Sequence, residues 1–418
     1  MIGGGAAASV TNVAGLTQLT SHRTATAQVG DGMALAVTRN TSSNTSTHTF
    51  DITNKYSTSI TADITISETG LSVSKTGVSI ASDTTNQIDI DAAHLDTVTP
   101  TVNISDSSQN VTASPTLSVP GPATGGTESI RVEQNGNLYD IHAFESTGTN
   151  TFEVNTVPSS GSVDALLVGG GGGGAGSPHA GGGGAGGLLF EQGISVSAQQ
   201  YTISVGDGGA GKVGAGDDDG YSVDGLNQGK DGEDTTAFDL TALGGGGGGG
   251  YDAGGDPDQP GRDGGSGGGG AKGAGENAFG AALQPGSTDG GSGNDGGVWG
   301  GYPNTNDYAG GGGGAGEAGS SGGDGGDGAD YSAQFSSAFG ENGYFAGGGG
   351  GAIYGSGPAD GGLGGGGKGD ANNMTDASKL DAQDFTGGGG GGAERRNGIL
   401  TGGDGGAGVV LVRYQVPV

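Results

Sequence analysis

Glycine is concentrated in one part of this chain, and that distribution limits what the chain can fold into. Residues 1–160 contain 13 glycines, whereas residues 161–418 contain the other 92 of the total of 105. A glycine-rich composition without order is typical of disordered, low-complexity sequence. The alternative is that the glycines build a repeated structure, and their arrangement favours this alternative.

The second part of the chain consists of glycine runs separated by polar segments. An apolar strand pattern, 163–168, leads into this region, and another, 409–414, ends it. Disordered tails seldom lie between two strong β-strand patterns, so we expect the region to be ordered. Eight runs contain four or more consecutive glycines: 169–174, 181–184, 244–250, 267–270, 310–314, 347–351, 364–367 and 387–392.

A glycine run can be ordered as a polyproline II helix, which has three residues per turn and no internal hydrogen bonds. Because glycine has no side chain, such helices can pack closely and hydrogen-bond to one another, which satisfies their backbone groups. Ordering glycine costs more conformational entropy than ordering any other residue. Many helices must therefore share hydrogen bonds, and we expect a bundle of five or more.

The first part of the chain has the pattern of antiparallel β-strands. Ile60, Ala62, Ile64 and Ile66 alternate with polar residues, and similar short runs follow between turn residues. The predicted fold class is thus all-β plus polyglycine II. The expected parts are an N-terminal arm or assembly segment, a β-sandwich-like domain, a linker, a β-hairpin unit with a turn at Asn135-Gly136, and a polyglycine II bundle with exposed loops: 1–30, 31–119, 120–126, 127–168 and 169–418.

Composition excludes several classes of protein. The chain has no cysteine, so it has neither disulfides nor a thiolate metal site. It has 45 acidic and 14 basic residues, which is the wrong balance for binding nucleic acid. No run of about 18 apolar residues is present, so we expect no membrane span. Met1–Val10 does not have the pattern of a signal peptide, and processing of the N-terminus stays open.

Catalysis is not expected. The five histidines show no metal-ligand spacing and no HExxH motif. His142 alternates with strand residues, which indicates a packed or surface histidine of a β-strand. His179 lies between two glycine runs and is expected in a loop. We therefore expect a protein that is not an enzyme and has no catalytic residues.

Acidic clusters on glycine-rich loops are candidate metal sites. Asp217 and Asp219 belong to one cluster, and Asp324 and Asp327 lie in a segment similar to part of a calcium-binding nonapeptide. Ca²⁺, Mg²⁺ and Na⁺ bind carboxylate and carbonyl oxygens. The alternative is that these loops are simply solvated, because the nonapeptide occurs once, without a tandem partner.

Aromatic residues in a polar loop are the candidate receptor-binding residues. Rigid aromatic rings beside asparagine and aspartate suit stacking on sugar rings and hydrogen bonding to hydroxyl groups. The alternative is that the rings form small cores over the helices. The candidates are Trp299, Tyr302, Asn304, Asn306, Tyr308 and Tyr251.

Asparagine glycosylation motifs are frequent in the first part and would suit an exported surface protein. A Thr/Ser-rich sequence also produces such motifs by chance. The candidates are Asn40, Asn44, Asn103 and Asn110.

Three motifs, taken in order, resemble the glycine-rich domains of tailed-virus fibre and adhesin proteins: 139–152 followed by 163–174, then 200–209, and finally 402–414. The resemblance covers about residues 127–418. It implies a rigid stack of polyglycine II helices whose loops at one end bind the host surface. The loops here are rich in aspartate and poor in tryptophan, so the same host chemistry is not implied.

Residues 31–115 are similar to small secreted β domains of halophilic archaea, through Phe50–Asn54 and the surrounding Thr, Ser and Asp residues. A net charge of −31 suits a surface that stays soluble in high salt. Secreted bacterial or viral glycine-rich proteins can also be acidic, which is the alternative.

Together these patterns predict a structural protein of the virion surface, as a tail fibre, spike or capsid turret, from a virus of a halophilic archaeon. Its N-terminal domain is expected to bind other virion proteins, and its loops a host surface glycan or S-layer glycoprotein. A homo-oligomer is expected. The alternative is a cell-surface or extracellular matrix protein of a halophilic microbe.

Overall fold

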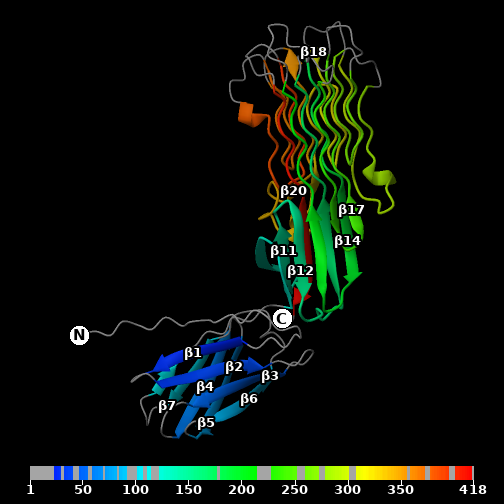
Figure 1. Cartoon of the computed structure of the whole chain (residues 1–418). Coiled ribbons are helices and arrows are strands. Elements are labelled where there is room, and N and C mark those ends of the chain that lie inside the picture. Colours follow the sequence, from blue (N-terminus) through cyan, green and yellow to red (C-terminus); the bar gives the residue numbers. More distant parts are fainter. Residues whose placement is uncertain are drawn as a thin grey trace, which may run out of the picture. The chain divides into compact units, whose positions relative to one another are not determined.

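The structure is a computed structural model of the chain, and its contacts divide the chain into two units (Figure 1). It describes strands and short adjoining segments between residues 23 and 113. It also describes residues 122–416, apart from 177–178, 214–226, 252–258, 273–277, 301–306, 355–357, 372–376 and 395–400. Unit one is formed mainly by residues 1–124 and unit two mainly by residues 125–415.

Unit one contains two antiparallel four-stranded sheets, with strand orders β1-β2-β3-β6 and β5-β4-β7-β8. These strands agree with the alternating pattern that predicted antiparallel β structure. β1 begins at Arg23, inside the segment that we expected to be an arm, because its Thr and Ala residues gave no clear strand pattern. The strands are β1 (Arg23–Val29), β2 (Met33–Asn40), β3 (Thr47–Asn54), β4 (Ile60–Glu68), β5 (Leu71–Ile80), β6 (Thr85–Asp91), β7 (Thr101–Asp106) and β8 (Val111–Ala113).

Unit two is built on two five-stranded sheets, with orders β10-β11-β22-β13-β14 and β17-β16-β15-β12-β9. Their strands are β9 (Ala123–Thr124), β10 (Glu128–Gln134), β11 (Asn137–Phe144), β12 (Gly148–Val154), β13 (Ser162–Val168), β14 (Leu188–Ser195), β15 (Gln200–Val205), β16 (Thr235–Ala237), β17 (Leu240–Ala242) and β22 (Val409–Val416). The short elements are β18 (Asp307–Tyr308), β19 (Ala329–Asp330), β20 (Tyr344–Phe345), β21 (Ile353–Tyr354), α1 (Ser332–Phe335), η1 (Gln284–Gly286) and η2 (Ala377–Lys379). The described part has no helix with the length and apolar character that crossing a membrane requires.

The predicted hairpin and closing strand are confirmed. β10 pairs with β11 so that Gln134 faces Asn137 across a two-residue turn. Asn135 and Gly136 both have positive φ, 53° and 79°, which is the conformation that asparagine and glycine favour in such turns. The closing strand β22 lies between β11 and β13 at the centre of its sheet. The last strand of the chain is thus bonded to the strand that enters the glycine-rich region.

Apolar strand residues form the core of unit two. Leu166, Val168 and Leu411 are buried, and they belong to one cluster with Phe335 and Phe345 from the segment around α1. At the same place the guanidinium of Arg413 bonds the carboxylate of Asp164 on β13 at 2.9 Å. This ion pair joins β13 to β22, at the register position where Asp164 and Arg413 face each other. The glycine-rich segments 169–176 and 401–408 adjoin these two strands.

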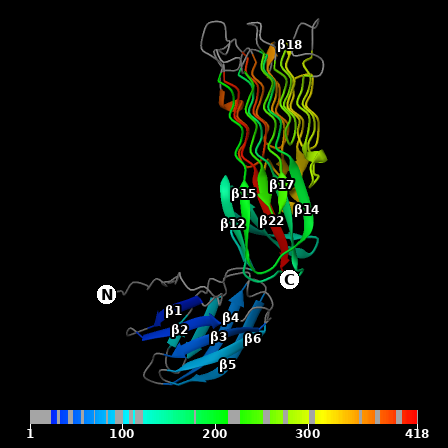
Figure 2. The same cartoon turned by 45° about the vertical axis from the view of Figure 1, so that its right-hand side comes forward.

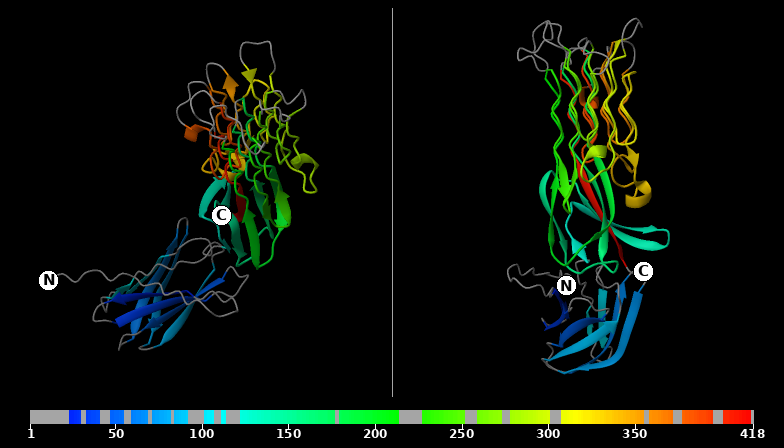
Figure 3. Two further views of the ribbon diagram at one scale, coloured as in Figure 1. Left: turned by 45° about the horizontal axis from the view of Figure 1, so that its top comes forward. Right: turned by 90° about the vertical axis from the view of Figure 1, so that its right-hand side faces the viewer.

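Glycine-rich segments continue directly from the strands. Residues 169–176 follow β13, residues 180–187 precede β14, and residues 401–408 precede β22. In Figures 1 to 3 the segments run side by side away from the sheets. We call the segments between residues 169 and 408 the glycine array. They form no continuous β ladder, because consecutive residues bond different neighbours.

The hydrogen bonds of residues 169–176 show how the array is built. The N–H groups of 169, 172 and 175 bond carbonyls of segment 181–187. Those of 170, 173 and 176 bond segment 227–233, and those of 171 and 174 bond segment 403–406. Each N–H direction thus returns at every third residue.

Each inner segment has six neighbours. Residues 169–176 donate N–H groups to three segments, and their carbonyls accept N–H groups from residues of three others: 209–212, 245–248 and 390–393. Because neighbours lie on every side, a side chain has no space at the glycines in the middle of a segment, whereas alanine is found nearer the segment ends. A Cβ on Gly172 would come within 3.0 Å of the carbonyl oxygen of Gly246, and one on Gly183 equally close to that of Gly172. The inner segments with this bonding are 169–176, 180–187, 266–271, 309–315, 346–352 and 386–393.

We predict that Gly183→Ala destabilises the chain by about 3 kcal/mol, because overpacking a fixed backbone costs about that much. Gly286→Ala is the control, since nothing lies within 4 Å of its Cβ position. It should change stability by less than about 0.5 kcal/mol. Urea unfolding measures both. Equal stability of the two variants would contradict the close packing described above.

Candidate binding surface

Described segments of the glycine array end together on the side remote from the sheets. A segment that runs away from the sheets is followed in the chain by one that runs back, as 169–176 is by 180–187. Pairing near these ends agrees with this, since Val213 bridges Thr401, Ile353 bridges Ala371, and β18 pairs with β21. We call this end, remote from the sheets, the far end.

Tyr251 is the best-fixed candidate at the far end. Its ring contacts the His179 ring edge to face, with centroids 6.0 Å apart. Its backbone carbonyl accepts a hydrogen bond of 2.9 Å from the amide of Asn227, which is buried. Tyr251 is half-buried, so part of the ring is available to a ligand and part rests on the array.

Trp299 and Tyr308 flank residues 301–306, the candidate loop that contains Tyr302, Asn304 and Asn306. Gly300, next to Trp299, donates its N–H to the carbonyl of Tyr308 at 3.1 Å, which brings the two ends of the loop together. Both aromatic residues are half-buried. The indole Nε1 of Trp299 is buried and has no hydrogen-bond partner among the described residues, which indicates that this ring packs on the array.

Several candidates lie outside what the structure describes. Among the predicted receptor-binding residues these are Tyr302, Asn304 and Asn306, and among the predicted metal ligands Asp217 and Asp219. The candidate glycosylation sites Asn44 and Asn110 also lie outside. Asn40 and Asn103 lie on β2 and β7, but their side chains are not described.

Asp324 and Asp327 hold backbone amides together. The carboxylate of Asp324 accepts the N–H of Asp360, and that of Asp327 accepts the N–H of Leu363, both at 2.9 Å. The described residues contain no group of three or more His, Asp or Glu side chains placed to hold a metal ion. In the structure this pair links neighbouring segments, and its candidate role in ion binding stays a prediction.

The same three-residue spacing recurs at other edges of the array. Asp231 and Asp234 accept the N–H groups of Gly247 and Gly244. A third pair, Asp381 and Asp384, accepts the N–H groups of two residues that are also three apart in sequence, 404 and 407. Positions i and i+3 of these segments thus point the same way. The sequence shows the motif Asp-x-x-Asp. Its role in accepting backbone N–H groups becomes evident only from the arrangement of the segments in the array.

A buried carboxylate lies near the far end. Asp370 is fully buried, and its Oδ2 accepts the N–H of Glu394 at 3.0 Å, whereas its Oδ1 has no partner among the described residues. Burial raises the pKa of Asp370 to about 6. The neighbouring Glu394 carboxylate is itself buried and lies 3.3 Å from Nδ1 of His179. No sequence pattern indicated this group.

His142 is a packed residue of β11. The sequence predicted either a packed or a surface histidine on a β-strand. It is buried, its Nδ1 lies 2.8 Å from the carbonyl oxygen of Gly125, and its ring stacks on Tyr414. Burial lowers the pKa of His142 below 6.5. The imidazole is therefore held in the sheet.

We predict that the variant Asp324→Ala/Asp327→Ala loses about 2 kcal/mol of stability, since each lost hydrogen bond costs about 1 kcal/mol. Asp324→Asn/Asp327→Asn is the matched control, because an amide oxygen can still accept the same N–H groups. It should stay near the parent chain in urea unfolding, with or without calcium. A calcium-dependent midpoint in the parent, absent from the Asn variant, would instead support the predicted ion binding by this pair.

We predict that burial of Asp370 makes stability pH-dependent. Its pKa in the folded chain, about 6, is above its ordinary value of 3.8. Its contribution to stability is thus complete below pH 4 and is lost as the pH rises through 6, by at most about 1.4 kcal/mol per pH unit. Asp370→Asn should remove this part of the slope and stabilise the chain at pH 7. Identical slopes in urea midpoints between pH 4 and 7 would contradict it.

Comparison with known proteins gives one match. Neither a curated protein nor a solved structure matches the chain. A family described as a glycine-rich domain matches residues 146–415, which is 270 of the 418 residues. This agrees with the glycine-rich domain that the sequence predicted. Because the match covers more than half of the chain and includes the strands and segments of the array, the chain belongs to this glycine-rich domain family.

Proposed function

We propose that this chain is an adhesive protein of a virion surface, in which the glycine array holds binding residues at its far end. The observation that carries the proposal is that described array segments end together on the side remote from the sheets, where the half-buried Tyr251 and Tyr308 lie. Such an arrangement supports an exposed set of loops, and binding residues concentrate on loops held by a rigid scaffold.

We infer that the array segments are polyglycine II helices. A helix with three residues per turn presents successive N–H groups in three directions that repeat at every third residue. The hydrogen bonds of residues 169–176 and of residues 347–352 follow this repeat. In the second segment, 347 and 350 bond 364 and 367, while 348 and 351 bond 326 and 323. We also infer that the two sheets of unit one pack as a β-sandwich.

The aromatic residues at the far end support binding. Tyr251 and Tyr308 are each half-buried at the end of an array segment, and Tyr302 follows Gly300 in the sequence of the candidate loop. Partly fixed rings lose little conformational entropy on binding. The ligand that we propose is a host surface glycan or S-layer glycoprotein, bound without turnover.

The remaining parts of the proposal come from the sequence. The resemblance to tailed-virus fibre proteins is the reason for proposing that the chain is part of a virion. The excess of 45 acidic over 14 basic residues is the reason for proposing a halophilic archaeal host. Unit one would attach the chain to other virion proteins, and a homo-oligomer would add affinity through many copies. Detection of the chain in purified particles separates this proposal from a cellular surface protein.

We predict that the purified chain binds host cells and blocks adsorption of the virus. Tyr302→Ala/Asn304→Ala should weaken binding about tenfold, as loss of a well-placed contact residue does at interfaces. The control is Gln192→Ala, an exposed residue of β14 at the sheet end of unit two, which should bind as the parent does. Adsorption unaffected by a saturating amount of the chain would refute the adhesive function.

A further inference from the structure

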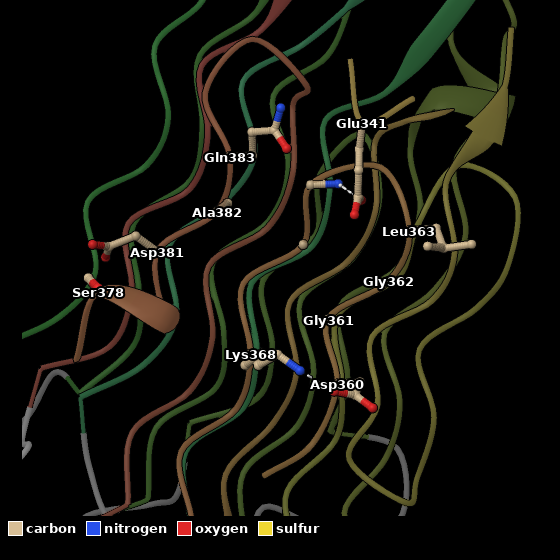
Figure 4. A pocket seen from close by; sticks show the side chains of 12 residues that line it. Glu341, Asp360, Gly361, Gly362, Leu363, Lys368, Ser378, Asp381, Ala382 and Gln383 are labelled. Carbon is tan, nitrogen blue, oxygen red and sulfur yellow. Dashed lines mark hydrogen bonds and ion pairs between the residues drawn. The ribbon is translucent and has the colours of Figure 1, made fainter. Parts of the chain in front are cut away.

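A groove lies on the side of the array, among residues that the sequence analysis did not single out. Its volume is about 520 Å³, which is within the usual range for small-molecule sites. It is bounded by the segments around 360–368 and 378–383 and by Glu341. In Figure 4, Asp381 and Gln383 lie on the opposite side from Leu363. We propose that this groove binds a neutral oligosaccharide.

The charges of the groove exclude polyanions. Three carboxylates, those of Glu341, Asp360 and Asp381, line it with a single cation, Lys368. The Lys368 ammonium is already paired with Asp360. A phosphate, a sulfated glycan or a polyuronate would meet uncompensated negative charge. A ligand without negative charge meets no such repulsion.

The hydrogen bonding of the groove suits hydroxyl groups, which both donate and accept. Asp381 uses Oδ1 to accept the N–H of Asp404, and no described residue bonds its Oδ2. The exposed amide of Gln383 has no partner among the described residues, and neither has the backbone of Gly361. Oxygen acceptors and nitrogen donors therefore remain available on both sides.

The apolar part of the groove is small. Leu363 is 47% exposed, and the other apolar surface comes from Ala382 and glycine Cα atoms. None of the described residues that line the groove is aromatic, so a nucleobase or a large apolar ligand would find no ring among them to stack on. The C–H face of a sugar ring needs only a small apolar contact.

An extended peptide is the main alternative, and the backbone argues against it. A strand that adds to an edge needs a row of available N–H and C=O groups. In this groove the N–H groups of Gly362, Leu363 and Gly365 are bonded to 348, Asp327 and Glu341. Those of Gly366, Lys368 and residues 382–383 are bonded as well. Among the described groove residues 360–368 and 381–383, the N–H groups without a partner are the isolated ones of Gly361 and Asp381.

The polar groups of the groove are held before a ligand arrives. Glu341 accepts the N–H groups of Gly364 and Gly365 at 2.7 and 2.9 Å through one carboxylate oxygen, and Asp381 is fixed by Asp404. The glycines that line the groove belong to the backbone-bonded array. Little binding free energy is lost to ordering such a preformed site, which matters for weakly bound ligands such as sugars.

Isothermal titration of the full chain tests the proposal, with maltotriose and N,N′,N″-triacetylchitotriose as neutral probes. Trigalacturonate serves as the anionic probe and hexaglycine as the peptide. We expect at least one neutral trisaccharide to bind with Kd of about 1 mM or tighter and trigalacturonate to bind at least tenfold more weakly. Asp381→Asn/Gln383→Ala should raise Kd by about tenfold or more. Asp234→Asn changes a carboxylate that also accepts a backbone N–H, that of Gly244, but neither residue lines the groove, and this variant should leave Kd unchanged.

Absence of binding by both neutral trisaccharides would overturn the proposal. Binding that survives Asp381→Asn/Gln383→Ala, or preferred binding of hexaglycine, would do the same. The outcome is separate from the adhesive function, since the groove variants leave the far end unaltered. The chain can therefore fail to attach to host cells while its groove binds sugar. It can equally attach to host cells while the groove binds none.

Discussion

Lateral hydrogen bonding between glycine segments is the interaction on which the rest of unit two depends. A segment such as 169–176 has no internal hydrogen bonds and no side chains to bury, apart from Ala175. Its ordered conformation is stabilised by hydrogen bonds to neighbouring segments, and each of these neighbours depends on such bonds in the same way. The sheets start this assembly, because the pairing of β13 with β22 places the segments that continue from them side by side. Conformational entropy opposes every glycine that joins, so the array is stable only as a whole.

The array also explains where glycine is required and where it is not. Inner segments have neighbours on all sides, and they contain six of the eight glycine runs. The longest run, 244–250, lies beside them, and the carboxylates of Asp234 and Asp231 accept the N–H groups of its Gly244 and Gly247. Edge segments have a solvent side, which accepts Asp, Lys or Gln. The run 364–367 is an exception, since Gly364 and Gly365 have positive φ in a turn beside Phe345. There glycine meets a backbone requirement of the turn.

Sequence patterns predicted much of this fold. The strand alternation, the Asn135-Gly136 turn and the apolar strands around the glycine region all depend on local sequence, and they were found where expected. The aspartate pairs could not be understood locally, because the amides that Asp324 and Asp381 accept lie in other segments, 23 to 36 residues away. The buried Asp370 and the side groove arise in the same way, from segments that meet only in the folded array. The acidic surplus was expected to serve solubility, and part of it forms these links.

Hydrogen exchange of the glycine amides tests the central claim most directly, namely that the array is a cooperative backbone-bonded structure. Amides of the inner segments, such as those of Gly172, Gly183 and Gly390, donate to neighbouring carbonyls at 2.7 to 2.9 Å. The account predicts that they exchange only through unfolding of the whole unit, with free energies equal to the global value. Exchange of these amides within seconds, at the rate of an unstructured glycine chain, would contradict it.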